Sequence, residues 1–180
     1  MRTLALTLSL LLAPAAFAAE DGWWTHSSQS WPYELRFPPG WKVMAPTRDK
    51  YDVEMVAPGG LEEGYCRVSR KKHWFLRVVS PKFLMKKLTK KKFQEHLRRV
   101  GDDDATVHTR TFHQVEGRAA VAFEFEFTHQ VNGAPAHLEV YSLTTVRGNK
   151  RYSAACAVVD GNYQTHKARL KEIVHTFRVF

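Results

Sequence analysis

The chain has 180 residues, of which 27 are Lys or Arg and 18 are Asp or Glu, so its formal net charge is +9. This length suits one domain with a substantial core, and the sequence contains no internal repeat or low-complexity linker. Its two cysteines do not make a zinc site by themselves, because such sites need further ligands. The composition therefore favours a small, basic, globular protein.

The first 18 residues have the pattern of a cleavable secretory signal. Arg2 supplies a positive charge, residues 4–12 are almost wholly apolar, and Ala16 and Ala18 are the small residues that signal peptidase recognises. The apolar run is shorter than the ~20 residues that a membrane-spanning helix needs. A buried N-terminal helix is the alternative interpretation. We predict cleavage near Ala18, export to the periplasm or the extracellular space, and no transmembrane segment in the mature chain.

After this segment, residues 19–30 lack a regular pattern, and we expect an irregular N-terminal arm there. A single domain should then span residues 31–180. Tyr33, Leu35 and Phe37 alternate with polar residues, which is the period of a half-buried strand. Other N-terminal elements are expected as strands at 41–44 and 51–55, a loop at 57–64, and a strand at 73–79.

Two consecutive helices are predicted next. Ser80 followed by proline is typical of a helix start, because the serine hydroxyl caps free amides and proline fits the first turn. The apolar residues that follow form two stripes that are out of phase. We therefore expect an interruption, with a second helix that starts at Thr89 and ends at Gly101. Phe83 and Phe93 are expected to belong to the core.

The C-terminal part has the pattern of an antiparallel meander that ends in a helix. Glu116-Gly117, Asn132-Gly133 and Gly148-Asn149 are turn-forming dipeptides that separate strand-like runs. The predicted strands are 105–115, 118–129, 137–147 and 150–159. Beyond them, apolar residues recur at helical spacing from Tyr163 to Phe177, so an amphipathic helix should pack on the sheet.

Two-residue turns between these strands would determine which side chains share a face of the sheet. Phe123, Phe125 and Phe127 would lie on one face, and Ala122 and Leu143 on the other. Because both faces are largely apolar, both need a cover, and helices are the available covers. The predicted fold is therefore α+β, with a central antiparallel sheet of the meander plus N-terminal strands, flanked by helices on both faces.

Several segments resemble a known family. Residues 33–41 (Tyr-Glu-Leu-Arg-Phe-Pro-Pro-Gly-Trp) look like the opening strand and turn of PsbP-like and DcrB-like proteins. Residues 117–120, 150–152 and 173–177 are similar to later segments of that family, in the same order. The resemblance covers roughly residues 31–180 and depends on the order of individually weak motifs.

The resemblance implies an antiparallel sheet with helices on both sides and, usually, no catalysis. Members of the family act as luminal subunits of photosystem II, as envelope lipoproteins, or as chaperones and adaptors. This chain departs from the lipoproteins because it lacks the cysteine that would carry the lipid, and it is unusually basic. We therefore expect an exported, non-enzymatic binding or assembly module of the PsbP-like type.

The two cysteines, Cys66 and Cys156, are expected to form a disulfide. An even number of cysteines in an exported protein favours pairing, because the compartment is oxidising. Two separate buried thiols are the alternative.

No catalytic or cofactor-binding motif occurs in the sequence, so we predict neither enzymatic activity nor a cofactor. His108 and His113 are an odd number of residues apart on one strand, which predicts opposite faces and no shared ligation. Under the expected register Glu126 faces Glu139, and His137 lies beside them. These three side chains could hold zinc or manganese, so a metal- or ligand-binding protein is the alternative function. A plainer interpretation is that the carboxylates meet Lys or Arg from elsewhere.

A basic sector is the strongest functional signal. Residues 67–99 contain thirteen Lys or Arg and a single acidic residue, Glu95. The cations on the predicted helices are Lys82, Lys86, Lys87, Lys90, Lys91, Lys92, Arg98 and Arg99. We expect this sector to dock on an anionic membrane surface or an acidic envelope protein. A solvated helix face is the alternative, and nucleic acid is disfavoured by the predicted compartment.

Overall fold

The computed structural model describes residues 22–46, 49, 51–72, 80–99, 103–131, 133–159 and 161–180. The predicted signal segment, the predicted strand at 73–79 and the predicted helix end at Gly101 lie outside the described residues.

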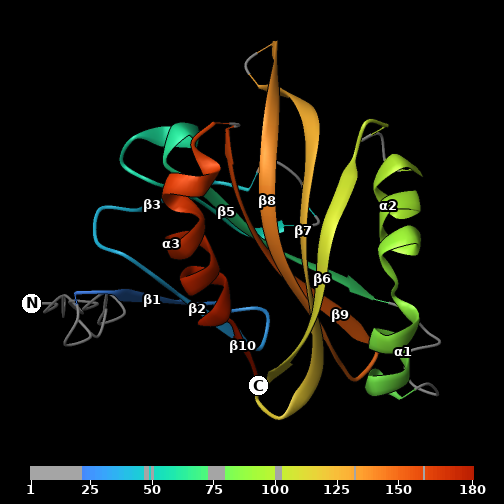
Figure 1. Ribbon diagram of the computed structural model, residues 1–180. Helices are drawn as coiled ribbons and strands as arrows, with labels where there is room; N and C mark the ends of the chain where they lie inside the picture. The colour runs from blue at the N-terminus through green and yellow to red at the C-terminus, as the bar shows by residue number, and fades with distance from the viewer. Residues whose placement is uncertain are drawn as a thin grey trace, which may run out of the picture.

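Seven antiparallel strands form the main sheet, in the order β3-β4-β5-β9-β8-β7-β6 (Figure 1). Their bounds are β3 Lys42–Met44, β4 Tyr51–Val56, β5 Tyr65–Lys72, β6 Thr106–Val115, β7 Arg118–Val131, β8 Ala134–Arg147 and β9 Lys150–Val159. The predicted meander is confirmed as β6 to β9. Its first turn is tight, because Val115 pairs with Arg118 and both intervening residues, Glu116 and Gly117, have positive φ.

A second, three-stranded sheet has the order β1-β2-β10. It consists of β1 Trp24–Ser27, β2 Tyr33–Phe37 and β10 Arg178–Val179. The prediction of an irregular arm at 19–30 is wrong for residues 24–27, which form a strand paired with β2. The ring of Trp24 lies 5.3 Å from that of Phe37, so this strand also has an aromatic contact to β2. The strand predicted from Tyr33 to Phe37 is confirmed, but it belongs to this small sheet and not to the main one.

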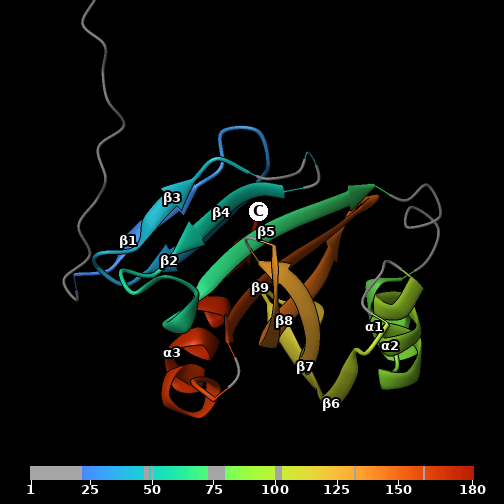
Figure 2. The ribbon, with the colours of Figure 1, turned by 90° about the horizontal axis from the view of Figure 1, so that it is seen from above.

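Three helices cover the two faces of the main sheet, α1 Pro81–Lys87 and α2 Lys90–Arg99 on one side and α3 Tyr163–His175 on the other (Figure 2). The interruption between α1 and α2 is confirmed. The Ser80 hydroxyl accepts a hydrogen bond from the Phe83 amide, and the Thr89 hydroxyl accepts one from the Lys92 amide. A 3-10 turn, Gly60–Glu62, lies in the predicted loop. Among the described residues, no helix is long and apolar enough to cross a membrane.

The two faces of the sheet carry separate hydrophobic cores, as the predicted register requires. Phe125 pairs with Val140 and Ala122 pairs with Leu143. Phe123, Phe125 and Phe127 pack with α1 and α2, whereas Ala122 and Leu143 pack with α3 and the small sheet. The predicted helix–sheet–helix arrangement is confirmed.

Strand β5 was not predicted, and it joins the two halves of the main sheet. Its buried residues, Cys66 and Val68, alternate with Arg67 and Ser69, which is the period of a strand. Its last three residues, 70–72, are all basic, so the alternation is too short to be recognised in the sequence. The strand lies between β4 and β9 and pairs with β9 along its whole length. It therefore connects the N-terminal strands to the C-terminal meander.

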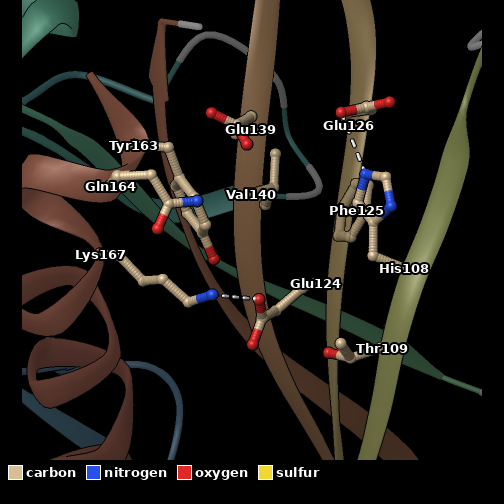
Figure 3. Close-up of a pocket in the computed structure, with 10 residues that line it drawn as sticks. All are labelled: His108, Thr109, Glu124, Phe125, Glu126, Glu139, Val140, Tyr163, Gln164 and Lys167. Atoms are coloured by element: carbon tan, nitrogen blue, oxygen red, sulfur yellow. Dashed lines mark ion pairs between the residues drawn. The ribbon is translucent and has the colours of Figure 1, made fainter. Parts of the chain in front are cut away.

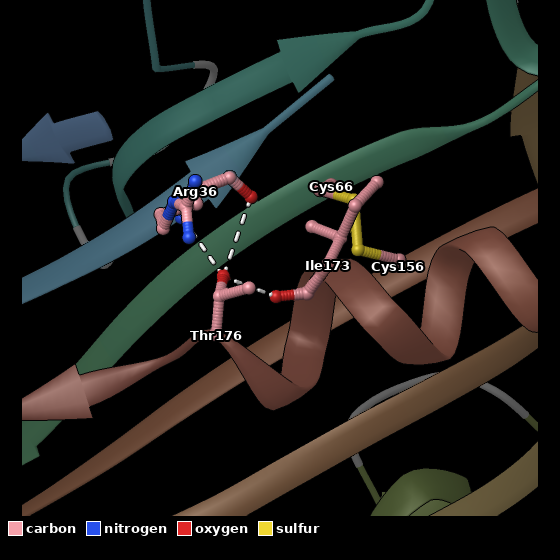
Figure 4. The surroundings of a disulfide bond; sticks show 5 residues. All are labelled: Arg36, Cys66, Cys156, Ile173 and Thr176. Atoms are coloured by element: carbon pink, nitrogen blue, oxygen red, sulfur yellow. Dashed lines mark hydrogen bonds between the residues drawn. A yellow bond between two sulfur atoms is a disulfide. The ribbon is translucent and has the colours of Figure 1, made fainter. Parts of the chain in front are cut away.

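A disulfide between Cys66 and Cys156 confirms the predicted pairing. The two residues are directly opposite each other in the β5–β9 register, with Cα atoms 4.0 Å apart. Ile173 of α3 lies beside the bond (Figure 4), and Thr176 at the end of α3 receives a hydrogen bond from the Arg36 amide at 2.8 Å. The cross-link therefore lies where β5, β9 and α3 meet, close to the small sheet.

Candidate functional site

The predicted cations gather on the layer formed by α1 and α2. Lys82, Lys86 and Lys87 are exposed on α1, and Lys90, Lys91, Lys92, Arg98 and Arg99 are exposed on α2. We call these eight residues the basic surface. Glu95 is the one acidic residue within the two helices. Such an excess of one charge sign produces a local positive potential that attracts anions.

The opposite side of α2 holds this layer against the sheet. Leu97 is buried, and the ring of Phe93 stacks on that of Phe123 with centroids 4.0 Å apart. Phe93 therefore belongs to the core, as predicted. The prediction is wrong for Phe83, which is 52% exposed because it lies on the same outward side of α1 as Lys87.

Arg110 of β6 binds the segment where α1 ends and α2 begins, a role that was not predicted from the sequence. Its Nε donates to the Leu88 carbonyl and its Nη2 to the Met85 carbonyl, each at 2.7 Å. These carbonyls lie at the end of α1, where helical hydrogen bonding runs out. Nearby, Lys90 Nζ donates to the His108 carbonyl at 2.5 Å. One cation of the basic surface is thus also a structural contact to β6.

On the other face of the sheet, the predicted Glu126, Glu139 and His137 come together. Glu126 pairs with Glu139 in the register, and His137 Nε2 lies 3.7 Å from Glu126 Oε2. His108 approaches more closely, with its Nε2 3.0 Å from the same oxygen. The structure therefore adds His108 to the three predicted residues. We call Glu126, Glu139, His137 and His108 the Glu/His face.

The position of His108 corrects the prediction that it and His113 point to opposite faces. The β6–β7 register shifts between Val107 and Thr109, so His108 is an extra residue at a β-bulge. The bulge changes the parity of the strand. His108 then contacts Glu126, and His113 packs against His175 of α3, on the same face of the sheet.

Glu124 adjoins the Glu/His face but is neutralised by α3. Lys167 Nζ lies 2.9 Å and Lys171 Nζ 2.5 Å from its carboxylate oxygens (Figure 3 shows the first contact). Burial raises the pKa of Glu124, but the hydrogen bonds and charges of Lys171 and Lys167 outweigh this effect, so the pKa is lowered. The neighbouring Glu124 therefore has the lysine partners that the plainer interpretation assigned to Glu126 and Glu139, whereas Glu126 lies beside two histidines.

A cavity of about 370 Å³ lies between this part of the sheet and the start of α3. Figure 3 shows Glu124, Glu126 and Glu139 around it, with Tyr163 and Lys167 reaching in from the helix. Within the described residues, no group of three or more His, Cys, Asp or Glu is arranged to hold a metal ion. Metal binding by Glu126, Glu139 and His137 stays a prediction.

Two histidines, one on β6 and one on α3, lie in contact where these two elements meet. The His113 and His175 rings are in contact, with centroids 4.8 Å apart, and His175 Nε2 lies 2.7 Å from the Tyr141 hydroxyl. Burial lowers the pKa of both side chains. The neighbouring His113 and Lys171 lower the pKa of His175 further, and Lys171 lowers that of His113 further. Both imidazoles are therefore favoured in their neutral form.

We expect stability to fall as the pH drops below about 6.5, the ordinary histidine pKa, because the unfolded chain then binds protons that the folded chain excludes. Urea unfolding across pH 7.5 to 5.5 measures this effect. The double variant His113→Gln/His175→Gln should show a weaker pH dependence, not a flat one, because His26 also has a lowered pKa. His129→Gln, at an exposed site on β7, is the control. An unchanged slope in the double variant would contradict the prediction.

No family model matches the sequence, and no curated protein is significantly similar to it. Solved structures do match. The solution structure of cyanobacterial PsbP (CyanoP) from Synechocystis sp. PCC 6803 has a TM-score of 0.63 and 12% identity, over 94% of this chain and 99% of that one. The chain has the PsbP-like fold. LpqN, involved in cell envelope biogenesis of Mycobacterium tuberculosis, shares this PsbP-like fold with a TM-score of 0.54 and 12% identity over 82% of each chain.

Proposed function

We propose that this protein is an exported, non-enzymatic docking module that attaches through its basic surface to an anionic membrane. The observation that carries the proposal is the exposure of eight cations on α1 and α2, with Glu95 as the one acidic residue among them. A surface that serves only solubility normally mixes both signs of charge. A single-sign surface of this kind suits a partner of opposite charge.

Three further features support export and docking. The Cys66–Cys156 disulfide fits an oxidising compartment outside the cytoplasm. The likeness to LpqN is one of fold, and its description as an envelope-biogenesis protein agrees with an envelope role. The packing of Phe93 on Phe123 and the contacts of Arg110 attach α1 and α2 to the sheet, so the backbone that carries the cations is already folded when they meet a membrane.

Vesicle cosedimentation tests the proposal. Each lysine near an anionic bilayer contributes about 1 kcal/mol, so Lys91→Gln/Lys92→Gln should weaken binding to phosphatidylglycerol vesicles roughly thirtyfold. Glutamine has a helix propensity close to that of lysine, so α2 should remain folded. Lys90 is left unchanged because it contacts the His108 carbonyl.

The matched control is Lys42→Gln/Arg169→Gln, which removes the same charge from exposed sites on β3 and α3. Its affinity should stay within a fewfold of wild type. Binding should also disappear at about 0.5 M salt, where charges are screened over a few ångströms, and on vesicles of neutral lipid. Equal losses in the two double variants, or binding that salt does not change, would contradict the proposal. Binding to acidic envelope proteins, with no binding to vesicles, would contradict the membrane as the partner and would favour an acidic protein.

A further inference from the structure

A second cavity, of about 570 Å³, lies between α1 and the β6–β7 hairpin. Lys82, Met85 and Lys86 line it from α1, and Phe112 and Ala119 line it from the sheet. Its volume falls within the range of about 300–1,000 Å³ that is typical of small-molecule sites. It is separate from the cavity beside the Glu/His face, which lies under α3.

The charged residues that line this cavity are all cations. Lys82 and Lys86 are exposed at its edge, and Arg118 also lines it while donating a hydrogen bond to the Val179 carbonyl at 2.9 Å. No Asp or Glu is among the described residues that line it. The two lysines are therefore placed to bind an anionic group at the mouth.

The walls of the cavity are largely apolar. Met85 is 3% exposed and lies on the side of α1 that faces the sheet. Phe112 is 53% exposed, although the Arg110 guanidinium covers part of it at 4.1 Å from the ring centroid. Phe112 and Met85 therefore give the cavity an apolar wall on which an alkyl chain can pack.

We propose that this cavity binds one molecule of a single-chain anionic amphiphile, such as a fatty acid or an alkyl phosphate. The carboxylate or phosphate pairs with Lys82 and Lys86, and the alkyl chain packs on Phe112, Met85 and Ala119. Both parts of the ligand thus meet complementary groups. This binding goes beyond the attachment to membranes, since Lys87, Lys90, Lys91 and Lys92 do not line the cavity.

Calorimetric titration with dodecanoate below its micelle concentration tests the site. We expect saturable binding of one molecule per chain. Dodecanol lacks the anionic head and inorganic phosphate lacks the chain, so each should bind at least about tenfold more weakly. Lys82→Gln/Lys86→Gln should weaken dodecanoate binding by about tenfold or more, because it removes both charged partners of the head.

Two phenylalanines provide a matched pair for the apolar wall. Phe112 and Phe83 are 53% and 52% exposed, but only Phe112 lines the cavity. Phe112→Ser should weaken dodecanoate binding about tenfold, whereas Phe83→Ser should leave it unchanged. Ala119→Phe should block the cavity, and circular dichroism would verify that this variant is folded.

Several results would overturn the site. They are equal losses in Phe112→Ser and Phe83→Ser, dodecanol binding as tight as dodecanoate binding, or binding that survives in a folded Ala119→Phe variant. Loss of dodecanoate binding in Lys91→Gln/Lys92→Gln would also overturn it, because the ligand would then adsorb to the basic surface in general. If that variant loses vesicle binding but keeps dodecanoate binding, both the docking function and a cavity site that shares Lys82 and Lys86 with the basic surface are supported.

Discussion

Removal of the Cys66–Cys156 disulfide should lower the free energy of unfolding by about 2–5 kcal/mol. The two cysteines are 90 positions apart, so the bond restricts a large part of the unfolded chain. It also joins β5 to β9, the junction between the N-terminal strands and the meander. Both side chains are fully buried, so the substitutions additionally remove packing against α3.

Urea unfolding of Cys66→Ala, Cys156→Ala and the double variant measures this loss. Either single substitution already breaks the cross-link, so the double variant should cost much less than the sum of the two single variants. Wild-type protein unfolded in the presence of a reductant should show a similar loss. A change below about 0.5 kcal/mol in the reduced wild type would contradict the prediction, because a cross-link of this span should contribute more.

Arg110→Ala should lower the free energy of unfolding by about 2–4 kcal/mol, since it removes charge-assisted hydrogen bonds to two carbonyls at the C-terminal end of α1. The Met85 and Leu88 carbonyls would lose these partners in a partly buried position. Arg110→Lys should recover only part of the loss, because a lysine ammonium cannot reproduce the planar fork that reaches both carbonyls. Thermal and urea unfolding of the two variants provide the measurement.

Arg99→Ala is the matched control for this variant. Arg99 is exposed at the end of α2, so its replacement should change stability by less than about 0.5 kcal/mol. Similar losses for Arg110→Ala and Arg99→Ala would show that Arg110 acts through general charge alone. Because α1 carries three cations of the basic surface, Arg110→Ala should also weaken vesicle binding, although Arg110 itself is not one of the eight.

Much of the architecture follows from local sequence signals. Turn dipeptides such as Glu116-Gly117 mark where one strand of the meander ends and the next begins, because few residues tolerate positive φ. Because these turns are short, they fix which residues of neighbouring strands are paired, and alternation along each strand then fixes the face of the sheet on which a side chain lies. The predicted pairing of Glu126 with Glu139 is confirmed. The break between α1 and α2 likewise follows from Ser80 and Thr89, whose hydroxyls cap the helix that each precedes.

Other features depend on contacts that no local pattern contains. The bulge at His108 reverses the strand parity and brings this histidine to Glu126, and a one-residue irregularity of this kind leaves no sequence signal. The pairing of Glu124 with Lys167 and the role of Arg110 arise only when distant segments pack together.

Local sequence patterns are therefore enough to predict the helix–sheet–helix order and the basic charge of α1 and α2. These properties depend on hydrophobic period, turn chemistry and composition, which are local. In contrast, the position of β5 between the two halves of the sheet and the register that sets Cys66 opposite Cys156 become visible only in the folded chain. The same is true of the cavity that Phe112 lines together with Lys82 and Lys86. Each of these depends on contacts between residues far apart in the chain, whose geometry is set only by packing.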